Sequence, residues 1–400
     1  MSTTSLTTVL PPAAMPATTR PNWVVARAPW HCKAVVFAAM CILVGIVWDI
    51  SWHETIGRDS FWTPAHICIQ LGALIGGSVC GWLVLKATFF GNEAERASAV
   101  RVWGLRGPLG AWVTIWGALA MITSAPFDNW WHNAYGLDVQ ILSPPHSVLA
   151  AGMYFLVFGG LLQVLSIQNR SASEGGTAGR WLFVLAGGIL LCMASIMIME
   201  KTFPNQQHAA GFYRTTMLVF PFFIFPIARA AKVPMPATTV AATYMLLMGT
   251  AVWVLPLFPG QPRLAPIYNP VTHMVPPPFP MLLMLPALAI DAAMAIFGRG
   301  RQWWRDALIV LVGGGGFAAL FGLTQWNISK FLLTPAAHNW FFVGNRYWPF
   351  DTPQKEWRLE FWRLDTDPVN LNAMLWALGL ALVSSALGLA LGNWMARVKR

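Results

Sequence analysis

The sequence predicts an all-α fold, a polytopic bundle of about ten transmembrane helices. Hydrophobic residues fill 56% of the 400 positions and charged residues only 10%, and a water-soluble domain does not carry so little charge on its surface. Apolar stretches of about 20 residues recur along the chain, and each is long enough to cross a hydrocarbon core of roughly 30 Å as a helix. A lipid bilayer is therefore the first partner that the sequence implies.

The expected spans follow one another through most of the chain. They lie near residues 33–52, 64–86, 109–127, 145–166, 181–200, 215–231, 237–258, 276–297, 306–325 and 372–395. Four cysteines lie inside these spans and Cys32 just before one, without a CxxC pair, so we interpret all five as apolar packing residues.

Basic residues gather in every second connection, as they do in the cytoplasmic loops of membrane proteins. They precede the first span (Arg20, Arg27, Lys33), join the second span to the third (Lys86, Arg96, Arg101, Arg106) and follow the last span (Arg397, Lys399, Arg400). Residues 128–144 contain no Lys or Arg. We therefore expect a bacterial inner-membrane protein with both termini in the cytoplasm. The net charge of +10 follows from this topology and from anionic inner-leaflet lipid, so no nucleic acid partner is expected.

Composition divides the chain into five parts. Residues 1–32, rich in Thr, Pro and Ala, predict a disordered cytoplasmic tail, and residues 33–166 a four-helix region that carries the motifs described below. Further transmembrane helices fill 167–325, and 372–400 is the last helix with a basic cytoplasmic tail. Residues 326–371 mix tryptophans with both signs of charge, which predicts an extracytoplasmic cap or a docking surface for another subunit.

One motif occurs twice, each time running from the outer end of one span into the start of the next. The first copy comprises Asp49, His53, Gly57, Asp59, Thr63, Pro64 and His66, and the second comprises Asp128, His132, Gly136, Asp138, Ser143, Pro144 and His146. The second loop is one residue longer. Because both copies have the same orientation, the first four helices predict a parallel duplication of a helical hairpin.

Each copy has the residue types and spacing of a metal site. Asp and His four positions apart stand above one another on a helix face. The second His falls near the third position of the following helix, which Ser/Thr followed by Pro is well suited to start. Two imidazoles and a carboxylate leave coordination positions open, as reactive copper, non-haem iron or catalytic zinc require. Gly57 and Gly136 would let the chain turn back.

The alternative interpretation is that these residues only anchor the helix ends, because His, Asp and Trp also gather at membrane interfaces. Seven of the eight histidines fall on the expected outer side, however, and four of them recur in one spaced motif. Ionisable groups at the edge of the apolar zone are costly unless they are paired or bind a metal. This pattern favours metal binding, with His273, Asp59, Asp138 and His208 as additional candidate ligands.

The segment from Asp49 through His53 to His66, with Thr63 and Pro64 opening the second helix, resembles a copper-binding segment of the particulate methane and ammonia monooxygenases, the copper membrane monooxygenase family. The resemblance implies Asp49, His53 and His66 as copper ligands, and a complex of several membrane subunits that hydroxylates a small substrate. It covers about 20 residues strongly. The second copy departs from the family spacing by one loop residue, which favours tighter binding at the first copy.

The leading functional hypothesis is therefore a copper-dependent membrane oxidoreductase, or its metal-bearing subunit, acting on a small apolar substrate. Zinc and iron are the alternative metals. A transporter or metal-handling permease is the second hypothesis, with Asp291 as a later station, and an accessory or assembly subunit is the third. The chain lacks a P-loop, a dinucleotide fingerprint, an HExxH motif and a haem-attachment CxxCH.

Three further features have alternative interpretations. His273 and Met274 are soft-metal ligand types, but a rigid proline-rich turn is favoured there. Glu200, Lys201, His208, Tyr213 and Arg214 predict an interfacial ion-pair cluster rather than a proton relay. Asp291, the acid inside the eighth span, is expected to pair with Arg299 or Arg301 or to serve a proton pathway.

Overall fold

The computed structural model describes residues 28–57, 62–136, 143–173, 177–261, 263, 271–298, 302–342 and 367–399. Within these ranges nine helices are long and apolar enough to cross a membrane, and one shorter apolar helix accompanies them. The described strands are only three residues each. The prediction of an all-α transmembrane bundle is confirmed, and the chain is an integral membrane protein in contact with lipid.

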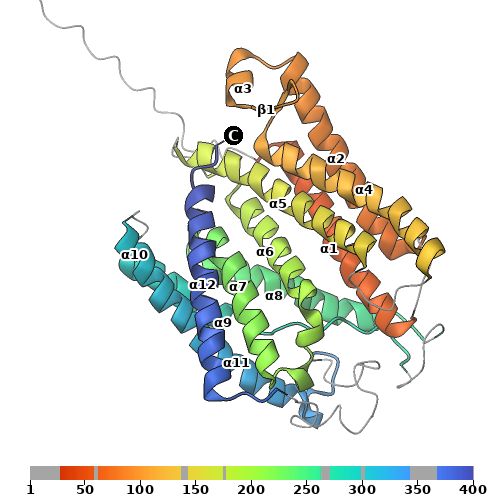
Figure 1. Ribbon diagram of the computed structural model, residues 1–400, viewed down its shortest axis with the longest axis vertical. Coiled ribbons are helices and arrows are strands. Elements are labelled where there is room, and N and C mark those ends of the chain that lie inside the picture. Colours follow the sequence, from red (N-terminus) through yellow and green to blue (C-terminus); the bar gives the residue numbers. More distant parts are fainter. Residues whose placement is uncertain are drawn as a thin grey trace, which may run out of the picture.

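The N-terminal half consists of two helical hairpins that pack side by side. The first pairs α1 (Trp30–Thr55) with α2 (Pro64–Phe89), and the second pairs α4 (Leu109–Tyr135) with α5 (Pro144–Ser173). Between the hairpins lie α3 (Glu93–Ser98) and the antiparallel strands β1 (Val100–Val102) and β2 (Leu105–Gly107). Figure 1 shows that this small insertion lies at one end of the bundle, whereas the α1–α2 and α4–α5 turns lie at the other.

The C-terminal half adds the remaining helices around α5. They are α6 (Arg180–Met197), α7 (Ala210–Ala230), α8 (Pro236–Val254), α9 (Met284–Phe297), α10 (Trp303–Leu308), η4 (Ile309–Gly314), α11 (Gly315–Leu332) and α12 (Leu371–Met395). The η4 segment is a π-type turn that joins α10 to α11 in one continuous span. Short 3₁₀ turns occupy Met199–Lys201 (η1), Pro204–Gln206 (η2), Leu255–Leu257 (η3) and Pro335–Ala337 (η5).

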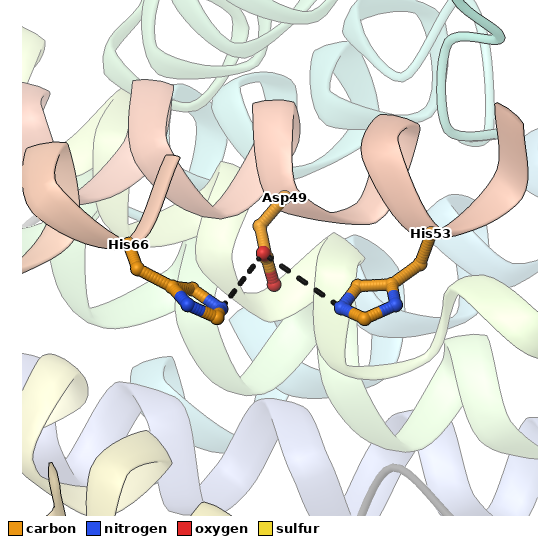
Figure 2. A group of neighbouring side chains, drawn as sticks. All are labelled: Asp49, His53 and His66. Carbon is orange, nitrogen blue, oxygen red and sulfur yellow. Dashed lines mark ion pairs between the residues drawn. The ribbon is translucent and has the colours of Figure 1, made fainter. Parts of the chain in front are cut away.

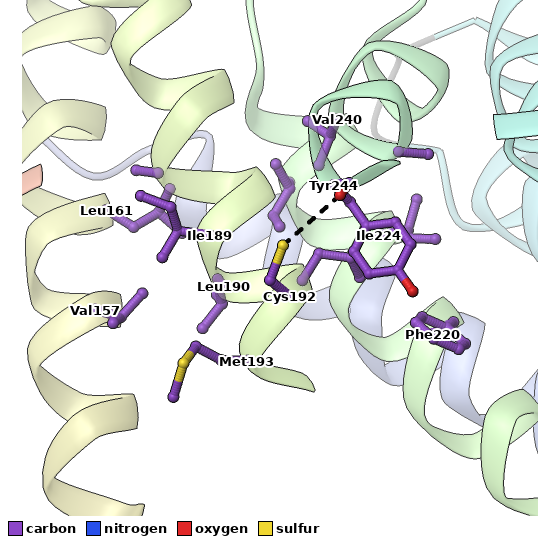
Figure 3. Close-up of a cluster of buried hydrophobic side chains, with 14 of the residues drawn as sticks. Val157, Leu161, Ile189, Leu190, Cys192, Met193, Phe220, Ile224, Val240 and Tyr244 are labelled. Carbon is purple, nitrogen blue, oxygen red and sulfur yellow. Dashed lines mark hydrogen bonds between the residues drawn. The ribbon is translucent and has the colours of Figure 1, made fainter. Parts of the chain in front are cut away.

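The apolar core lies where α5, α6, α7 and α8 meet. Figure 3 shows Leu161, Ile189, Ile224 and Val240, one from each of these helices, converging on this centre. Tyr244 is fully buried among them, and its hydroxyl donates to the carbonyl oxygen of Pro280 at 3.1 Å. Because this polar group has a partner, a tyrosine can occupy the core without an unpaired hydroxyl.

Small residues set the spacing of helices within each hairpin. A Cβ atom added to Gly72 would lie 2.7 Å from the carbonyl oxygen of Ala38, and one added to Gly152 would lie 2.8 Å from that of Gly117. Gly72 and Gly152 each follow the second motif histidine by six positions, and Ala38 and Gly117 each precede the motif aspartate by eleven. The two hairpins therefore share a helix crossing as well as a motif, since only small residues allow such close backbone approach.

The structure corrects three predicted boundaries. The eighth span was expected over 276–297, but its helix is only Met284–Phe297, because the prolines at 276–278 and 280 favour a non-helical approach. The third helix continues to Tyr135, well past the expected end at 127. The cap was expected from 326, but 326–332 still belongs to α11, and 343–366 lies outside the described residues.

Candidate metal centres

The first centre joins the end of α1 to the start of α2. Figure 2 shows the Asp49 carboxylate between the imidazoles of His53 and His66. The Nε2 atom of His66 lies 3.0 Å from Oδ1 of Asp49, and that of His53 lies 3.8 Å from the same oxygen. Asp49 and His53 come from consecutive turns of one helix, so their proximity follows from helix geometry alone. His66 is brought in by the hairpin.

The second centre repeats this arrangement between α4 and α5. The Nε2 atoms of His132 and His146 lie 3.4 and 3.5 Å from Oδ1 of Asp128. In both centres the ligand atoms all lie within 4.8 Å of one another. The additional residue in the second loop is thus absorbed without loss of convergence, because one more loop residue costs little free energy.

The helix starts hold the second histidine of each centre in the same way. The backbone N–H of His66 donates to Oγ1 of Thr63, and that of His146 donates to Oγ of Ser143, both at 3.4 Å. Each Ser/Thr is therefore an N-cap, which confirms the predicted helix starts. Gly57 has φ 104° and Gly136 has φ 86°, conformations that favour glycine. This agrees with their predicted role in turning the chain.

The donor atoms fit a metal ion better than they fit one another. Oδ1 of Asp49 and Oδ1 of Asp128 are buried and accept no hydrogen bond from the described residues, although imidazole nitrogens face them. A tetrahedral ion with ligands at about 2.0–2.2 Å holds its ligand atoms roughly 3.3–3.6 Å apart. The two distances at Asp128 fall in that range, and those at Asp49 lie on either side of it. A shared cation would satisfy these lone pairs.

The second centre also has a contact that orients one ligand. Nδ1 of His132 lies 3.1 Å from the carbonyl oxygen of Gly136, a group that can only accept a hydrogen bond. The proton must therefore be on Nδ1, which leaves the lone pair of Nε2 directed toward Asp128. This second contact, from imidazole to a backbone carbonyl, is the one that metal-binding histidines usually make.

Aromatic side chains surround the end of α4 beside this centre. Phe127, Trp130, Trp131 and Tyr135 contact one another, with ring centroids 4.5–6.5 Å apart. Trp and Tyr in such numbers mark the level of a membrane–water interface. The second centre thus lies at the edge of the apolar zone.

A single pocket of about 400 Å³, part of it open to the surroundings, connects the two centres. Its lining comprises His66, Ile69, Gln70, Ser124, Ala125, Asp128, Pro145, His146 and Leu149. His66 belongs to the first centre, whereas Asp128 and His146 belong to the second. Ile69, Leu149 and Pro145 make much of the wall apolar. A small molecule in this pocket would contact ligand residues of both centres.

The other candidate ligands do not join either centre. Asp59 and Asp138 lie outside the described residues. His273 is exposed, and its Nδ1 pairs with the Thr272 hydroxyl at 2.9 Å. His208 is buried, with 1% of its surface exposed, in the turn before α7.

Two predicted ionic interactions are also replaced by other contacts. Arg214 pairs with Asp367 at 3.3 Å, so the interfacial ion pair reaches across to the start of α12. Asp291 accepts hydrogen bonds from the backbone N–H groups of Ala237 and Thr238, at 3.0 and 2.8 Å. This carboxylate caps the start of α8. Arg299 and Arg301, its expected partners, lie outside the described residues.

Comparison with known proteins adds no family assignment. The chain matches no family model, and no curated protein and no solved structure is detectably similar to it. The argument about function therefore depends on the two centres and the pocket between them.

Sequence reasoning missed the polar residues of the pocket wall. Gln70 follows His66 by one helical turn, and Ser124 precedes Asp128 by one. The i,i+4 rule applied outward from each ligand would have placed them on the ligand face. It would not have shown that the two faces meet.

Proposed function

We propose that this chain is a membrane protein that binds one metal ion at each Asp-His-His centre. The observation that supports this most directly is the repeated geometry: a buried carboxylate oxygen, without a hydrogen bond from the described residues, faced by two imidazole Nε2 atoms. Only a cation between the three groups satisfies all their lone pairs at once.

Copper is the metal that we propose, with zinc or iron as alternatives. Imidazole ligands suit all three metals, and one carboxylate with two imidazoles leaves coordination positions open. Copper is preferred because the segment from Asp49 to His66 resembles the copper-binding segment of the particulate monooxygenases. When bound, copper would supply redox chemistry with dioxygen at the edge of the membrane.

We further propose an oxidoreductase role, as the metal-bearing subunit of a monooxygenase-like complex. The pocket between the centres supports this, because its apolar wall suits a small apolar substrate and its ligand residues come from both centres. Exposed apolar helix faces would give such a substrate a route through lipid. Other membrane subunits are proposed partners.

A transporter is the competing function. Transport across the bilayer needs ligand groups at successive depths, but the described residues contain only these two groups of three or more His, Cys, Asp or Glu, both at the same end of the bundle. This favours fixed centres. We propose that this end faces away from the cytoplasm of a bacterial inner membrane, with both termini inside.

Metal analysis of the purified full-length protein tests the proposal. We expect about two copper ions in the wild type and about one in each of two double variants, His53→Ala/His66→Ala and His132→Ala/His146→Ala. Electron paramagnetic resonance of the oxidised protein should show copper bound by nitrogen. Wild-type metal content in both double variants, at normal expression, would contradict the metal centres.

Oxygen consumption by membranes supplied with ammonia or a short alkane tests the oxidoreductase role separately. We expect substrate-dependent consumption in the wild type and its loss in both double variants. Copper binding without any oxygen-dependent turnover would leave the centres intact and favour transport or an accessory role.

A further inference from the structure

A small basic hairpin lies at the end of the bundle opposite the metal centres. It comprises residues 92–107, that is α3 with β1 and β2, and we call it the arginine hairpin. The backbone N–H of Arg106 donates to Oγ1 of Thr88 at 2.8 Å, and Nε1 of Trp112 donates to the carbonyl oxygen of Val100 at 3.2 Å. The hairpin is therefore held to both α2 and α4.

The strand register places two arginines side by side on the face away from the bundle. Val100 and Val102 pack with Leu105 against Val84 and Trp112. Since side chains alternate along a strand, Arg101 and its cross-strand partner Arg106 share the opposite face. Like charges directly opposite one another destabilise a strand pair unless an anion lies between them.

A third arginine adds to this charge. Nη1 of Arg106 donates to the carbonyl oxygen of Arg96 at 3.5 Å. None of these three guanidinium groups forms an ion pair with a described residue. The nearby acids are Glu93 and Glu95, both exposed, and the Glu95 carboxylate accepts the N-cap hydrogen bond from Asn92 at 3.2 Å.

Exposed aromatic rings lie beside the arginines. Trp103, at the hairpin turn, is 83% exposed and has φ 48°, a conformation that costs a non-glycine residue free energy. Its ring lies 5.3 Å from that of Trp116 in the membrane span α4. Phe89 and Phe90, at the end of α2, are 62% and 77% exposed. Uncovered rings next to basic groups are typical of the lipid headgroup level.

We propose that the arginine hairpin binds the phosphate headgroup of an anionic membrane lipid. Arg101 and Arg106 hold the phosphate from the exposed face of the strands, and Arg96 adds charge beside it. Trp103 and Phe90 lie among the neighbouring acyl-chain ends. The lipid would supply the counter-charge that the described residues do not, and arginine is well suited to it because its planar fork can form paired hydrogen bonds with phosphate oxygens.

Native mass spectrometry of the full-length protein, released from detergent with defined lipids, tests this site. We expect selective retention of phosphatidylglycerol over phosphatidylcholine by the wild type, and about 30-fold weaker retention by Arg101→Gln/Arg106→Gln, since each basic residue at the surface contributes about a tenfold factor or slightly less. The matched control, Arg397→Gln/Lys399→Gln, removes the same charge from the C-terminal tail and should retain phosphatidylglycerol like the wild type.

Other outcomes would overturn the proposal. Equal loss of phosphatidylglycerol in both double variants would assign the retention to net charge, not to the hairpin. Full displacement of the lipid by millimolar inorganic phosphate would assign the site to free phosphate. A Trp103→Ala variant separates folding from binding: it should weaken retention while its thermal unfolding in detergent stays close to that of the wild type.

Discussion

Individual carboxylates organise each metal centre, because one oxygen atom of Asp49 or Asp128 faces both histidines of its triad. The distances at Asp128 are nearly equal, 3.4 and 3.5 Å, whereas those at Asp49 are 3.0 and 3.8 Å. His132 is also oriented by the Gly136 carbonyl. Motif spacing favours the first centre for tighter binding, and these contacts favour the second.

Single histidine variants should therefore lose similar amounts of metal. We predict that His53→Ala and His132→Ala each remove about one bound metal ion, measured by inductively coupled plasma mass spectrometry. His273→Ala, whose imidazole pairs with Thr272 outside both centres, is the control and should retain the full content. Loss of both ions from either single variant would instead indicate that the centres bind metal only together.

Asp291 has a structural role that a different measurement can separate from proton transfer. Asp291→Asn replaces an acceptor with an amide that faces the N–H groups of Ala237 and Thr238. We predict a loss of about 1–3 kcal/mol in unfolding free energy, because a buried N–H group is left without a partner. Thermal unfolding in detergent measures this. Metal content should stay unchanged.

Asp367→Asn is the matched control for this variant. Asp367 forms a partly exposed ion pair with Arg214, and such pairs contribute within about 1 kcal/mol. A normal unfolding temperature for Asp291→Asn together with lost turnover would revive the proton-pathway interpretation.

Helix crossings decide whether the motif residues converge. Asp49 and His53 share one helix, but His66 reaches them only because α2 approaches α1 closely at Gly72. The second hairpin uses Gly152 at the equivalent position. The same small residues therefore set both the packing of a hairpin and the geometry of its metal centre.

Gly72→Ala should disturb the first centre from a distance. The added methyl group would meet the Ala38 carbonyl at 2.7 Å, so the helices must separate. We predict a loss of roughly 1–3 kcal/mol in stability and a reduced metal content at the first centre. Thermal unfolding and metal analysis measure the two effects.

Gly81→Ala lies on the same helix, with no atom within 4 Å of the added methyl group, and should be neutral or slightly stabilising. A similar response of the two glycine variants would show that helix propensity, and not the crossing, controls the centre.

The whole molecule separates two chemically different ends. The metal centres and their pocket lie at one end of the bundle, and the arginine hairpin lies at the other. Because a membrane separates two aqueous compartments, this arrangement assigns the two ends to opposite sides.

Cysteine labelling can test this arrangement. In a Cys68→Ala background, Trp62→Cys and Tyr135→Cys should react with an impermeant maleimide added to the outside of intact cells, whereas Ser98→Cys should react only after lysis. All three side chains are exposed, and the remaining native cysteines are buried. Labelling of positions 62 and 135 from opposite sides would contradict the paired centres.

Much of this protein could be predicted from the sequence because the relevant signals are local. Hydropathy identified the membrane segments, and the i,i+4 spacing placed Asp49 with His53 and Asp128 with His132 on helix faces. The repeat identified all six residues that the structure brings together in two triads. The N-caps at Thr63 and Ser143 were equally predictable, since a cap is set within three residues.

Only the tertiary structure decided how these local elements meet. The shared pocket depends on α2 facing α4 and α5, and the capping role of Asp291 depends on α9 lying beside the start of α8. The shortness of α9 reflects prolines inside an apolar stretch that hydropathy cannot distinguish from helix. Apolar pattern shows that a helix is buried in lipid or protein, but contacts between distant helices depend on shape, which one sequence does not state.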